Sequence, residues 1–291
     1  MGRTLLPDYI LGKRFLLRLS VSLNDNLINL PRIRRKKSVE KAIITVAGKG
    51  GVGKTSISAA IVRQLVKSYP EAKILAIDAD PAVGLATALD VEVTQTVDDI
   101  RKSILAASKG DREKKRTIEM LGEVRFRIFD AMVEKDGYAF IAVGRPEAAG
   151  CYCSINAYLK EVISMLSGEF DYVVIDGEAG IEQVNRRVME KVTHMILVTD
   201  PSKKGTRVIQ TIKTVADELV MYKEIGAVVN RINDEALKGY IDTGDIPVLS
   251  YIPDDKTLAL YDVQGRSVLE LPDDSNLVKG VRQALETIRI L

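Results

Sequence analysis

Cysteine is nearly absent from this sequence of 291 residues, which contains two, and histidine occurs once. Two cysteines cannot build a disulfide framework, so the chain suits a reducing compartment and we expect it in the cytoplasm. Long apolar runs are also absent. None approaches the roughly 18 residues that a membrane-spanning helix needs, so no such helix is expected. With His194 as the single histidine, no Ser–His–Asp or Cys–His catalytic arrangement is evident.

The charge is unevenly distributed along the chain. Residues 1–41 contain ten Lys and Arg against three Asp and Glu, whereas residues 42–291 contain 32 against 37. A globular part with a mildly negative balance does not favour nucleic-acid binding, so no nucleic-acid partner is expected. The change of sign near Ser38 marks a boundary. We therefore predict a basic N-terminal extension at 1–41 and one domain at 42–291.

Leucines recur at helical spacing in the N-terminal extension, from Leu16 to Leu30, and the basic run RIRRKK (32–37) follows them. One interpretation is an appendage, or translated upstream sequence, outside the functional domain. Another is an amphipathic helix that binds a membrane surface or a partner. A targeting peptide is a third, although no cleavage pattern is evident. Apart from residues 1–40, we expect no contact with a membrane.

Seven short segments of the domain run apolar throughout, which is typical of strands covered on both faces. They lie at 42–47, 73–78, 139–144, 171–176, 195–200, 226–230 and 247–252. Helical patterns occur at 54–68, 155–167, 181–192, 203–221 and 275–290, and the charged stretch 96–135 is expected to hold inserted helices. Strands that alternate with helices predict an α/β fold, with a doubly wound, mostly parallel sheet that binds ligands at its strand carboxyl ends. His194 precedes a strand, at the opposite edge, so we expect it to be structural.

The segment GKGGVGKT (48–55) follows the first predicted strand and opens a helix, which is the context that a P-loop requires. Its glycines let backbone N–H groups turn toward phosphate oxygens, and the helix N-terminus favours negative charge. Lys54 would bridge the β- and γ-phosphates, and the Thr55 hydroxyl would ligate Mg²⁺. The nucleotide-binding residues predicted here are Gly48, Lys49, Gly50, Gly51, Val52, Gly53, Lys54, Thr55 and Ser56.

A second lysine, Lys49, goes beyond the general P-loop pattern. With it, the loop resembles the deviant Walker A motif of the signature-lysine ATPases, which include nitrogenase iron protein, the cell-division and partitioning ATPases and the arsenite-pump ATPases. The resemblance implies ATP hydrolysis by a homodimer whose subunits face each other. In such a dimer Lys49 reaches the partner's nucleotide and supplies charge to the transition state. The catalytic residues that the resemblance implies are Lys49, Lys54 and Asp80.

Two further strand ends fit that family. DADP (78–81) resembles its first switch, in which Asp80 matches the residue that orients the attacking water, and DGEAG (176–180) resembles its second. The resemblance implies the switch residues Asp78, Asp80, Asp176 and Gly180. It implies Thr55, Asp80 and Asp176 around Mg²⁺, with Asp176 in the Walker B place and acting through water. An ordinary turn or a helix cap is the alternative for Asp78 and Asp80.

Two segments near the end of the chain, VVNR (228–231) and YIPDD (251–255), resemble the base-recognition region of the same family. The amide of Asn230 can both donate to adenine and accept from it. The second segment would pass along the purine. The residues predicted at the base are Asn230, Arg231, Pro253 and Asp254, and ordinary strand-end turns are the alternative for both segments.

The two cysteines, Cys151 and Cys153, form one Cys-x-Cys pair. An internal disulfide over this spacing would be strained, and two thiolates do not complete a tetrahedral site for a soft metal. Both precede a predicted helix N-cap at Ser154, a position that favours thiolate. A buried structural pair is the alternative. If two chains face each other, the two half-sites combine into an intersubunit Cys₄ site.

Taken together, GKGGVGKT, DADP, GRPEAAGCYC (144–153) and DGEAG resemble the CooC family, the nickel-insertion accessory ATPases of carbon monoxide dehydrogenase and acetyl-CoA synthase. The resemblance covers 42–291. It implies ATP and Mg²⁺ as cofactors, Ni²⁺ or Zn²⁺ at an intersubunit Cys₄ site, a homodimer, and a client nickel enzyme such as carbon monoxide dehydrogenase. The alternatives from other classes are an Fe–S electron-transfer protein like nitrogenase iron protein and a partitioning or cell-division ATPase.

Overall fold

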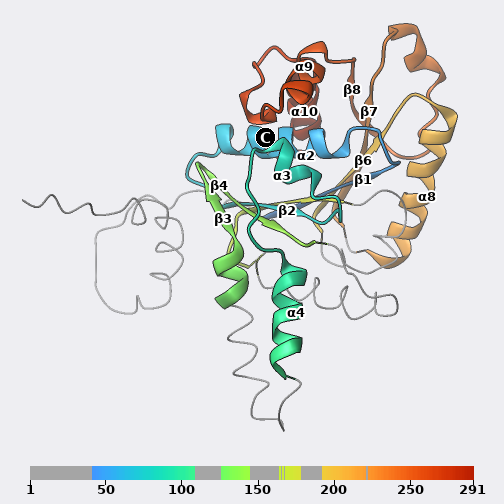
Figure 1. Ribbon diagram of the computed structural model, residues 1–291. Coiled ribbons are helices and arrows are strands. Elements are labelled where there is room, and N and C mark those ends of the chain that lie inside the picture. The colour runs from blue at the N-terminus through green and yellow to red at the C-terminus, as the bar shows by residue number, and fades with distance from the viewer. Residues whose placement is uncertain are drawn as a thin grey trace, which may run out of the picture.

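A single eight-stranded sheet forms the centre of the molecule (Figure 1). The computed structural model describes residues 41–108, 126–144, 168–177, 192–220 and 222–291, together with residues 164 and 166. The strand order is β3–β4–β2–β5–β1–β6–β7–β8, and all neighbours pair parallel except β3, which runs antiparallel to β4. The strands are β1 (Ala42–Gly48), β2 (Ile74–Asp78), β3 (Val133–Lys135), β4 (Tyr138–Ala142), β5 (Tyr172–Asp176), β6 (His194–Thr199), β7 (Glu224–Asn230) and β8 (Val248–Ile252). The predicted mostly parallel sheet is confirmed.

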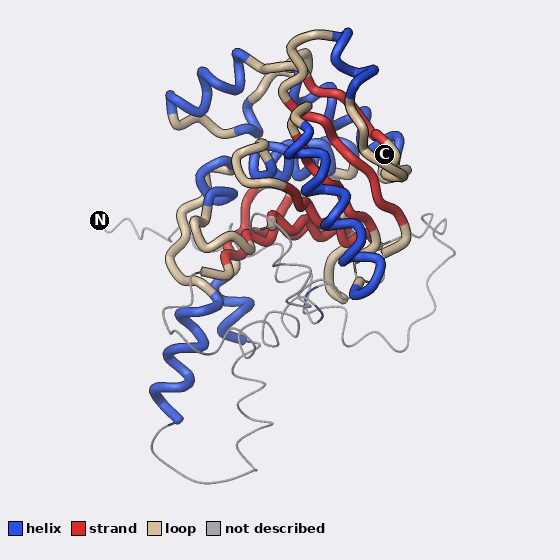
Figure 2. The backbone as a smooth tube through the Cα atoms, turned by 90° about the vertical axis from the view of Figure 1, so that its right-hand side faces the viewer, coloured by secondary structure: helices blue, strands red, loops and turns tan. Residues whose placement is uncertain are grey.

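Helices cover both faces of this sheet (Figures 1 and 2). On one face, α2 (Lys54–Ser68), α3 (Gly84–Ala88) and α10 (Asn276–Thr287) share a core with strand residues such as Ile44 and Val46. On the other face, α4 (Val97–Ser108) and α8 (Lys203–Leu219) share a second core with Ala47 and Leu75. Because successive side chains of a strand point to opposite faces, each strand must be apolar throughout to supply both cores.

The closing helix α10 packs as its spacing predicts. Leu277, Val281, Leu285 and Ile288 are each at most 3% exposed and belong to the core that α2 also lines. The apolar stripe of this helix is therefore used inside the fold and is not presented at the surface.

The predicted strand boundaries agree with the structure to within two residues, a normal difference for such assignments. The helices predicted at 155–167 and 181–192 lie largely outside the described residues. No helix among the described residues is both long enough and apolar enough to cross a bilayer.

The prediction of helices alone for 96–135 was wrong at its C-terminal end. Strand β3 pairs with β4 in a hairpin across Asp136 and Gly137, and Gly137 has a φ of 87°. An Asp-Gly pair is a strong signal for a two-residue hairpin turn, so the sequence contained this information.

Among the described residues, two helices and two 3₁₀ turns were not predicted. Helix α3 has only five residues, and α9 (Lys256–Gln264) has no buried residue. Neither therefore shows the apolar stripe by which a helix is recognised in a sequence. The 3₁₀ turns are η3 (Glu235–Tyr240) and η4 (Val268–Glu270).

Candidate nucleotide-binding site

The predicted motifs meet at one edge of the sheet, where neighbouring parallel strands end. Strand β5 lies between β1 and β2, so that Asp176 is in register with both Val46 and Asp78. On its other side β1 adjoins β6, with Gly48 in register with Val198. The P-loop, the DADP segment, the first residue of DGEAG and the end of β6 are therefore neighbours in space.

The P-loop backbone needs glycine at its two ends. A Cβ at Gly48 would lie 2.1 Å from the Val198 carbonyl oxygen, and a Cβ at Gly53 would lie 2.6 Å from the Asn230 Nδ2. Gly53 also has a φ of 93°, which side chains disfavour. Helix α2 begins immediately afterwards at Lys54, so its first N–H groups face the loop. This shape and the helix dipole suit a phosphate group.

The two lysines of the loop point to different places. Lys54 is 7% exposed, and its ammonium group lies 3.4 Å from the carbonyl oxygen of Lys49, across the loop. The ammonium group of Lys49 forms an ion pair of 2.9 Å with Oδ2 of Asp200, which follows β6. Burial raises the pKa of Asp200, but hydrogen bonds from Ser202 and Lys49 outweigh burial, and the net shift is downward.

Asp176 is fully buried at the end of β5, and within the described part of the chain only one of its carboxylate oxygens accepts a hydrogen bond. Its Oδ1 accepts a hydrogen bond of 2.8 Å from the Ser58 hydroxyl of α2, whereas Oδ2 has no hydrogen-bond partner among the described residues. Burial raises the pKa of Asp176, while Ser58, Thr55 and Lys54 act in the opposite direction. A buried carboxylate oxygen without a partner, close to the Thr55 hydroxyl, fits a divalent cation. Thr55 and Asp176 would hold Mg²⁺ directly or through water, and the ion would withdraw charge from the phosphates.

Asp78, in contrast, is satisfied on both oxygens. Its Oδ2 accepts hydrogen bonds from the N–H groups of Leu85 and Ala86 at 2.8 and 3.3 Å, and its Oδ1 accepts from the N–H of Asp80 at 3.2 Å. Burial and the charge of Asp176 raise the pKa of Asp78 to about 7. These contacts make Asp78 a helix cap that orders the first turn of α3.

Asp80 stands in the loop that Asp78 orders. Its carboxylate is partly exposed and accepts a hydrogen bond of 2.9 Å from the N–H of Ala82. The start of α3 packs against the P-loop helix, since a Cβ at Gly84 would lie 3.6 Å from the Thr55 Cγ2. Asp80 is thus carried on a loop that contacts the predicted magnesium ligand.

The end of β7 braces the P-loop. Asn230 donates from Nδ2 to the Val52 carbonyl at 2.8 Å, and its Oδ1 accepts from the N–H of Arg231 at 3.0 Å. Arg231 donates from Nη1 to the Gly51 carbonyl at 2.9 Å. Both polar ends of the Asn230 side chain therefore contact protein, and the predicted contact with adenine would have to share or exchange these hydrogen bonds.

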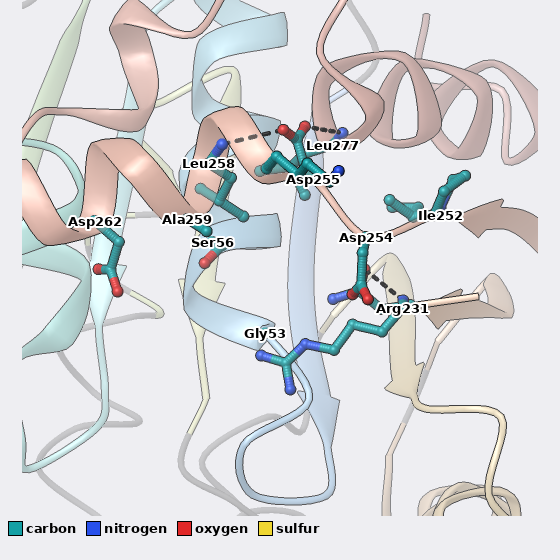
Figure 3. A pocket seen from close by; sticks show the side chains of 13 residues that line it. Gly53, Ser56, Arg231, Ile252, Asp254, Asp255, Leu258, Ala259, Asp262 and Leu277 are labelled. Atoms are coloured by element: carbon teal, nitrogen blue, oxygen red, sulfur yellow. Dashed lines mark hydrogen bonds between the residues drawn. The ribbon is translucent and has the colours of Figure 1, made fainter. Parts of the chain in front are cut away.

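A pocket of about 460 Å³ opens beside the start of α2 (Figure 3). Residues from four stretches of the chain line it: Gly53, Ser56, Asn230, Arg231, Ile252, Pro253, Asp254, Asp255, Lys256, Leu258, Ala259, Asp262 and Leu277. Figure 3 shows the Arg231 side chain extending from the strand end toward the loop at Gly53. All four residues predicted at the base lie on this pocket, and its volume is within the usual range for small-molecule sites.

Three predicted site residues, Cys151, Cys153 and Gly180, lie outside the described residues. In the part of the chain that the structure describes, no group of three or more His, Cys, Asp and Glu side chains could hold a metal ion. His194 is the first residue of β6, at the edge opposite the P-loop, and its Nδ1 lies 2.7 Å from the Thr193 hydroxyl.

Sequence reasoning missed three residues of this site. Asp200 could have been predicted from the sequence, because it ends an apolar run just as Asp78 and Asp176 do. Ser58 lies one turn after Lys54 on α2, but a serine within a helix is not by itself informative. Asp255 belongs to the predicted segment YIPDD, but its role was missed: it caps the unpredicted helix α9, which forms one wall of the pocket.

Comparison with known proteins agrees with this geometry. Residues 43–268 match the CobQ/CobB/MinD/ParA nucleotide binding domain. An ATP-binding protein of Methanocaldococcus jannaschii is 37% identical over 250 residues, which cover 84% of this chain and 98% of that protein. The carbon monoxide dehydrogenase accessory protein CooC of Rhodospirillum rubrum is 30% identical over 243 residues, which cover 78% of this chain and 89% of that protein.

Solved structures show the same fold. The septum site-determining protein MinD from Pyrococcus horikoshii OT3, complexed with Mg-ADP, superposes with a TM-score of 0.61 at 22% identity. The match covers 86% of this chain and 97% of that one. From the P-loop at the end of β1, the pocket beside α2 and these matches, we conclude that the chain belongs to the CobQ/CobB/MinD/ParA family and is a P-loop ATPase.

Proposed function

We propose that this ATPase is a maturation factor of the CooC kind, which helps to insert nickel into carbon monoxide dehydrogenase or a related Ni–Fe–S enzyme. The observation that carries the proposal is the Cys-x-Cys pair, Cys151 and Cys153, in a chain 30% identical to a carbon monoxide dehydrogenase accessory protein. These are the only cysteines of the sequence. Two chains that face each other would supply four thiolates, which suit Ni²⁺ or Zn²⁺ as cargo in a tetrahedral or square-planar site.

The ATPase site would drive this dimer between closed and open forms. The P-loop N–H groups and Lys54 bind the phosphates, and the pocket beside α2 takes the adenosine. Asp80 orients the attacking water, and Lys49 crosses to the nucleotide of the second chain. Hydrolysis then separates the chains and loosens the metal for transfer to the client enzyme in a reducing, cytoplasmic setting.

The test is metal content measured together with molar mass. The full chain is incubated with Ni²⁺ or Zn²⁺ under reducing conditions, with and without ATP. We expect one metal ion per two chains in a dimer, and its loss in the double variant Cys151→Ala, Cys153→Ala with ATP binding retained. Tyr152→Phe is the matched control, since it alters the residue between the cysteines and keeps both thiols.

Two outcomes would contradict the proposal. Iron together with sulfide in the dimer would favour the electron-transfer alternative. A chain that binds no metal and stays monomeric under all conditions would leave an ATPase whose cysteines have another role.

A cell-division type of ATPase is the second candidate, because the structural likeness to MinD covers most of the chain. Such a protein would need an amphipathic tail or a basic surface to reach its membrane or DNA. Helix α10 does not supply the tail, since its apolar side chains are buried. The leucine stripe and basic run of residues 1–40 are the sequence features that fit that role.

A further inference from the structure

Lys49 is neutralised within its own chain, and the partner group comes from a distant segment. Asp200 lies 151 residues away in the sequence, and the ion pair forms because β1 and β6 are neighbours whose ends carry the two residues. The two side chains are 29% and 26% exposed. An ion pair that is partly shielded from solvent is stronger than one on an open surface.

Contacts other than the ion pair with Lys49 orient the Asp200 carboxylate. Its Oδ1 accepts hydrogen bonds from the N–H and from the hydroxyl of Ser202, which is the N-cap of α8. The Ser202 hydroxyl in turn accepts from the N–H of Gly205 at 3.0 Å. A Cβ at Gly205 would lie 2.3 Å from the Asp200 Oδ1, so a larger residue there would displace this carboxylate. The first turn of α8 is therefore built around this carboxylate, and Oδ2 is directed at Lys49.

The ion pair with Asp200 competes with any interaction between Lys49 and the nucleotide of a second chain. To reach a phosphate of another subunit, the ammonium group must exchange Asp200 for that phosphate. We propose that Asp200 is a positioning residue that retains Lys49 in the isolated chain and so sets the concentration at which two chains associate on ATP. The proposal rests on the face-to-face dimer of the proposed function.

We assign the exchange to a second chain that carries nucleotide, because a triphosphate has more negative charge than the single carboxylate of Asp200. Closure of an empty dimer would leave Lys49 in its ion pair. Asp200 would thus suppress association in the absence of ATP. When ATP is bound, Lys49 would stabilise the dimer by pairing with the phosphates of the second chain.

The first measurement follows Lys49 without nucleotide, where no dimer is needed. The rate of acetylation of Lys49 by an N-hydroxysuccinimide ester is measured by peptide mass spectrometry in the wild-type chain and in Asp200→Asn. Asparagine keeps an oxygen for Ser202 and removes the charge. We expect acetylation of Lys49 to be several times faster in Asp200→Asn. An unchanged rate would show that Asp200 does not retain the Lys49 ammonium group, and it would overturn the proposal.

The second measurement follows association, with a non-hydrolysable ATP analogue and Mg²⁺, by molar mass as a function of chain concentration. We expect the midpoint of dimerisation to fall about 25-fold in Asp200→Asn, because each of the two chains exchanges one partly exposed ion pair and each pair contributes about fivefold. Asp245→Asn is the matched control, because Asp245 forms a 3.1 Å ion pair with Lys213 on the surface, away from the P-loop. It should change neither Lys49 acetylation nor the midpoint.

The results separate this proposal from the proposed function. Faster acetylation with an unchanged or higher midpoint would show that Asp200 retains Lys49 without setting the concentration of association, which overturns the proposal and leaves the dimer intact. A wild-type chain that remains monomeric with the analogue would overturn the face-to-face dimer itself, whatever the acetylation rates. The melting temperature of Asp200→Asn checks that the cap of α8 is preserved.

Discussion

Asp78 and Asp176 end adjacent strands of the sheet and are both fully buried, yet their surroundings assign them different roles. Asp78 accepts three backbone N–H groups and is satisfied by its own loop. Asp176 accepts one hydroxyl and keeps an oxygen without a partner among the described residues. A carboxylate of the second kind is suited to a cation, whereas one of the first kind orders the chain around it.

Ser58 determines which oxygen of Asp176 is left for the cation. We predict that Ser58→Ala raises the Mg²⁺ concentration for half-maximal ATPase activity about three- to tenfold, because the carboxylate loses the hydrogen bond that orients it. Nucleotide binding without Mg²⁺ should be unchanged. The measurement is a magnesium titration of the ATPase rate.

Ser250→Ala is the matched control for this variant. The Ser250 hydroxyl is buried in β8 without a hydrogen-bond partner among the described residues, so its removal should leave the magnesium titration unchanged. An identical titration for Ser58→Ala and the wild type would show that Asp176 is oriented without Ser58.

Arg231 combines a strained backbone with a contact to the P-loop. Its φ is 62°, and its guanidinium group donates to the Gly51 carbonyl. We predict that Arg231→Gly weakens nucleotide binding about tenfold, because the loop loses a brace, and leaves the melting temperature unchanged or higher, because glycine suits this φ. Arg231→Ala should weaken binding equally and lower the melting temperature. Calorimetric titration with ADP would check both variants. Tighter binding by either variant would show that the hydrogen bond from Arg231 to Gly51 does not stabilise the P-loop for nucleotide binding.

At the scale of elements, one wall of the pocket beside α2 depends on a single carboxylate. Asp255 caps α9 by accepting from the N–H groups of Thr257 and Leu258 on Oδ1. Its Oδ2 accepts from the Leu277 N–H at 2.9 Å, at the start of α10, and from the Ser275 hydroxyl. One side chain therefore joins the N-termini of two helices, as the dashed lines of Figure 3 show in part.

We predict that Asp255→Asn lowers the free energy of unfolding by about 1–3 kcal/mol at neutral pH, because the amide must turn an NH₂ group toward one of the two sets of donors. Burial raises the pKa of Asp255, but its hydrogen bonds outweigh burial and the net shift is below the ordinary 3.8. The contribution of Asp255 is therefore complete above that value and is lost as the pH falls through the lowered pKa.

Urea unfolding at several pH values measures this difference. The two proteins should differ at pH 7 and converge as the pH falls below about 4. Asp274→Asn, in an exposed residue before α10, is the control and should have little effect. A difference between Asp255→Asn and the wild type that persists undiminished in acid would show that the charge of Asp255 is not what stabilises the two helices.

At the scale of the whole molecule, the sheet separates two cores, and its central strand β1 carries the P-loop. The first residue of β1 is Ala42, and the family match begins at residue 43. The family match and the first strand thus both begin just after the predicted basic extension.

We predict that deletion of residues 1–40 leaves the ATPase rate and the metal content per chain within about twofold of the wild type, because no strand or core residue of the described fold is removed. Deletion through residue 48 is the contrasting variant, since it removes β1 and should abolish folding. Loss of ATPase activity or of metal binding on deletion of 1–40 would favour a role for the extension in the site.

Much of the fold followed from the sequence because its signals are local. Apolar runs of five to seven residues, such as 171–176, predict strands at any place in a chain, and a glycine-rich turn between a strand and a helix predicts a P-loop. Helix α9 could not be recognised this way, since none of its residues is buried. Strand β3 was missed, although Asp136 and Gly137 signal its turn.

What the sequence by itself determined is thus the order of the seven apolar strands, the mostly parallel sheet and the phosphate-binding loop, all of which depend on residues close together in the chain. Only the tertiary structure decided which groups meet: Ser58 with Asp176, Asn230 with Val52, and Lys49 with Asp200. The partners in these pairs are 118, 178 and 151 residues apart. Periodicity shows that a strand is buried, but the choice of its neighbours depends on the packing of the whole sheet, and these contacts follow from that choice.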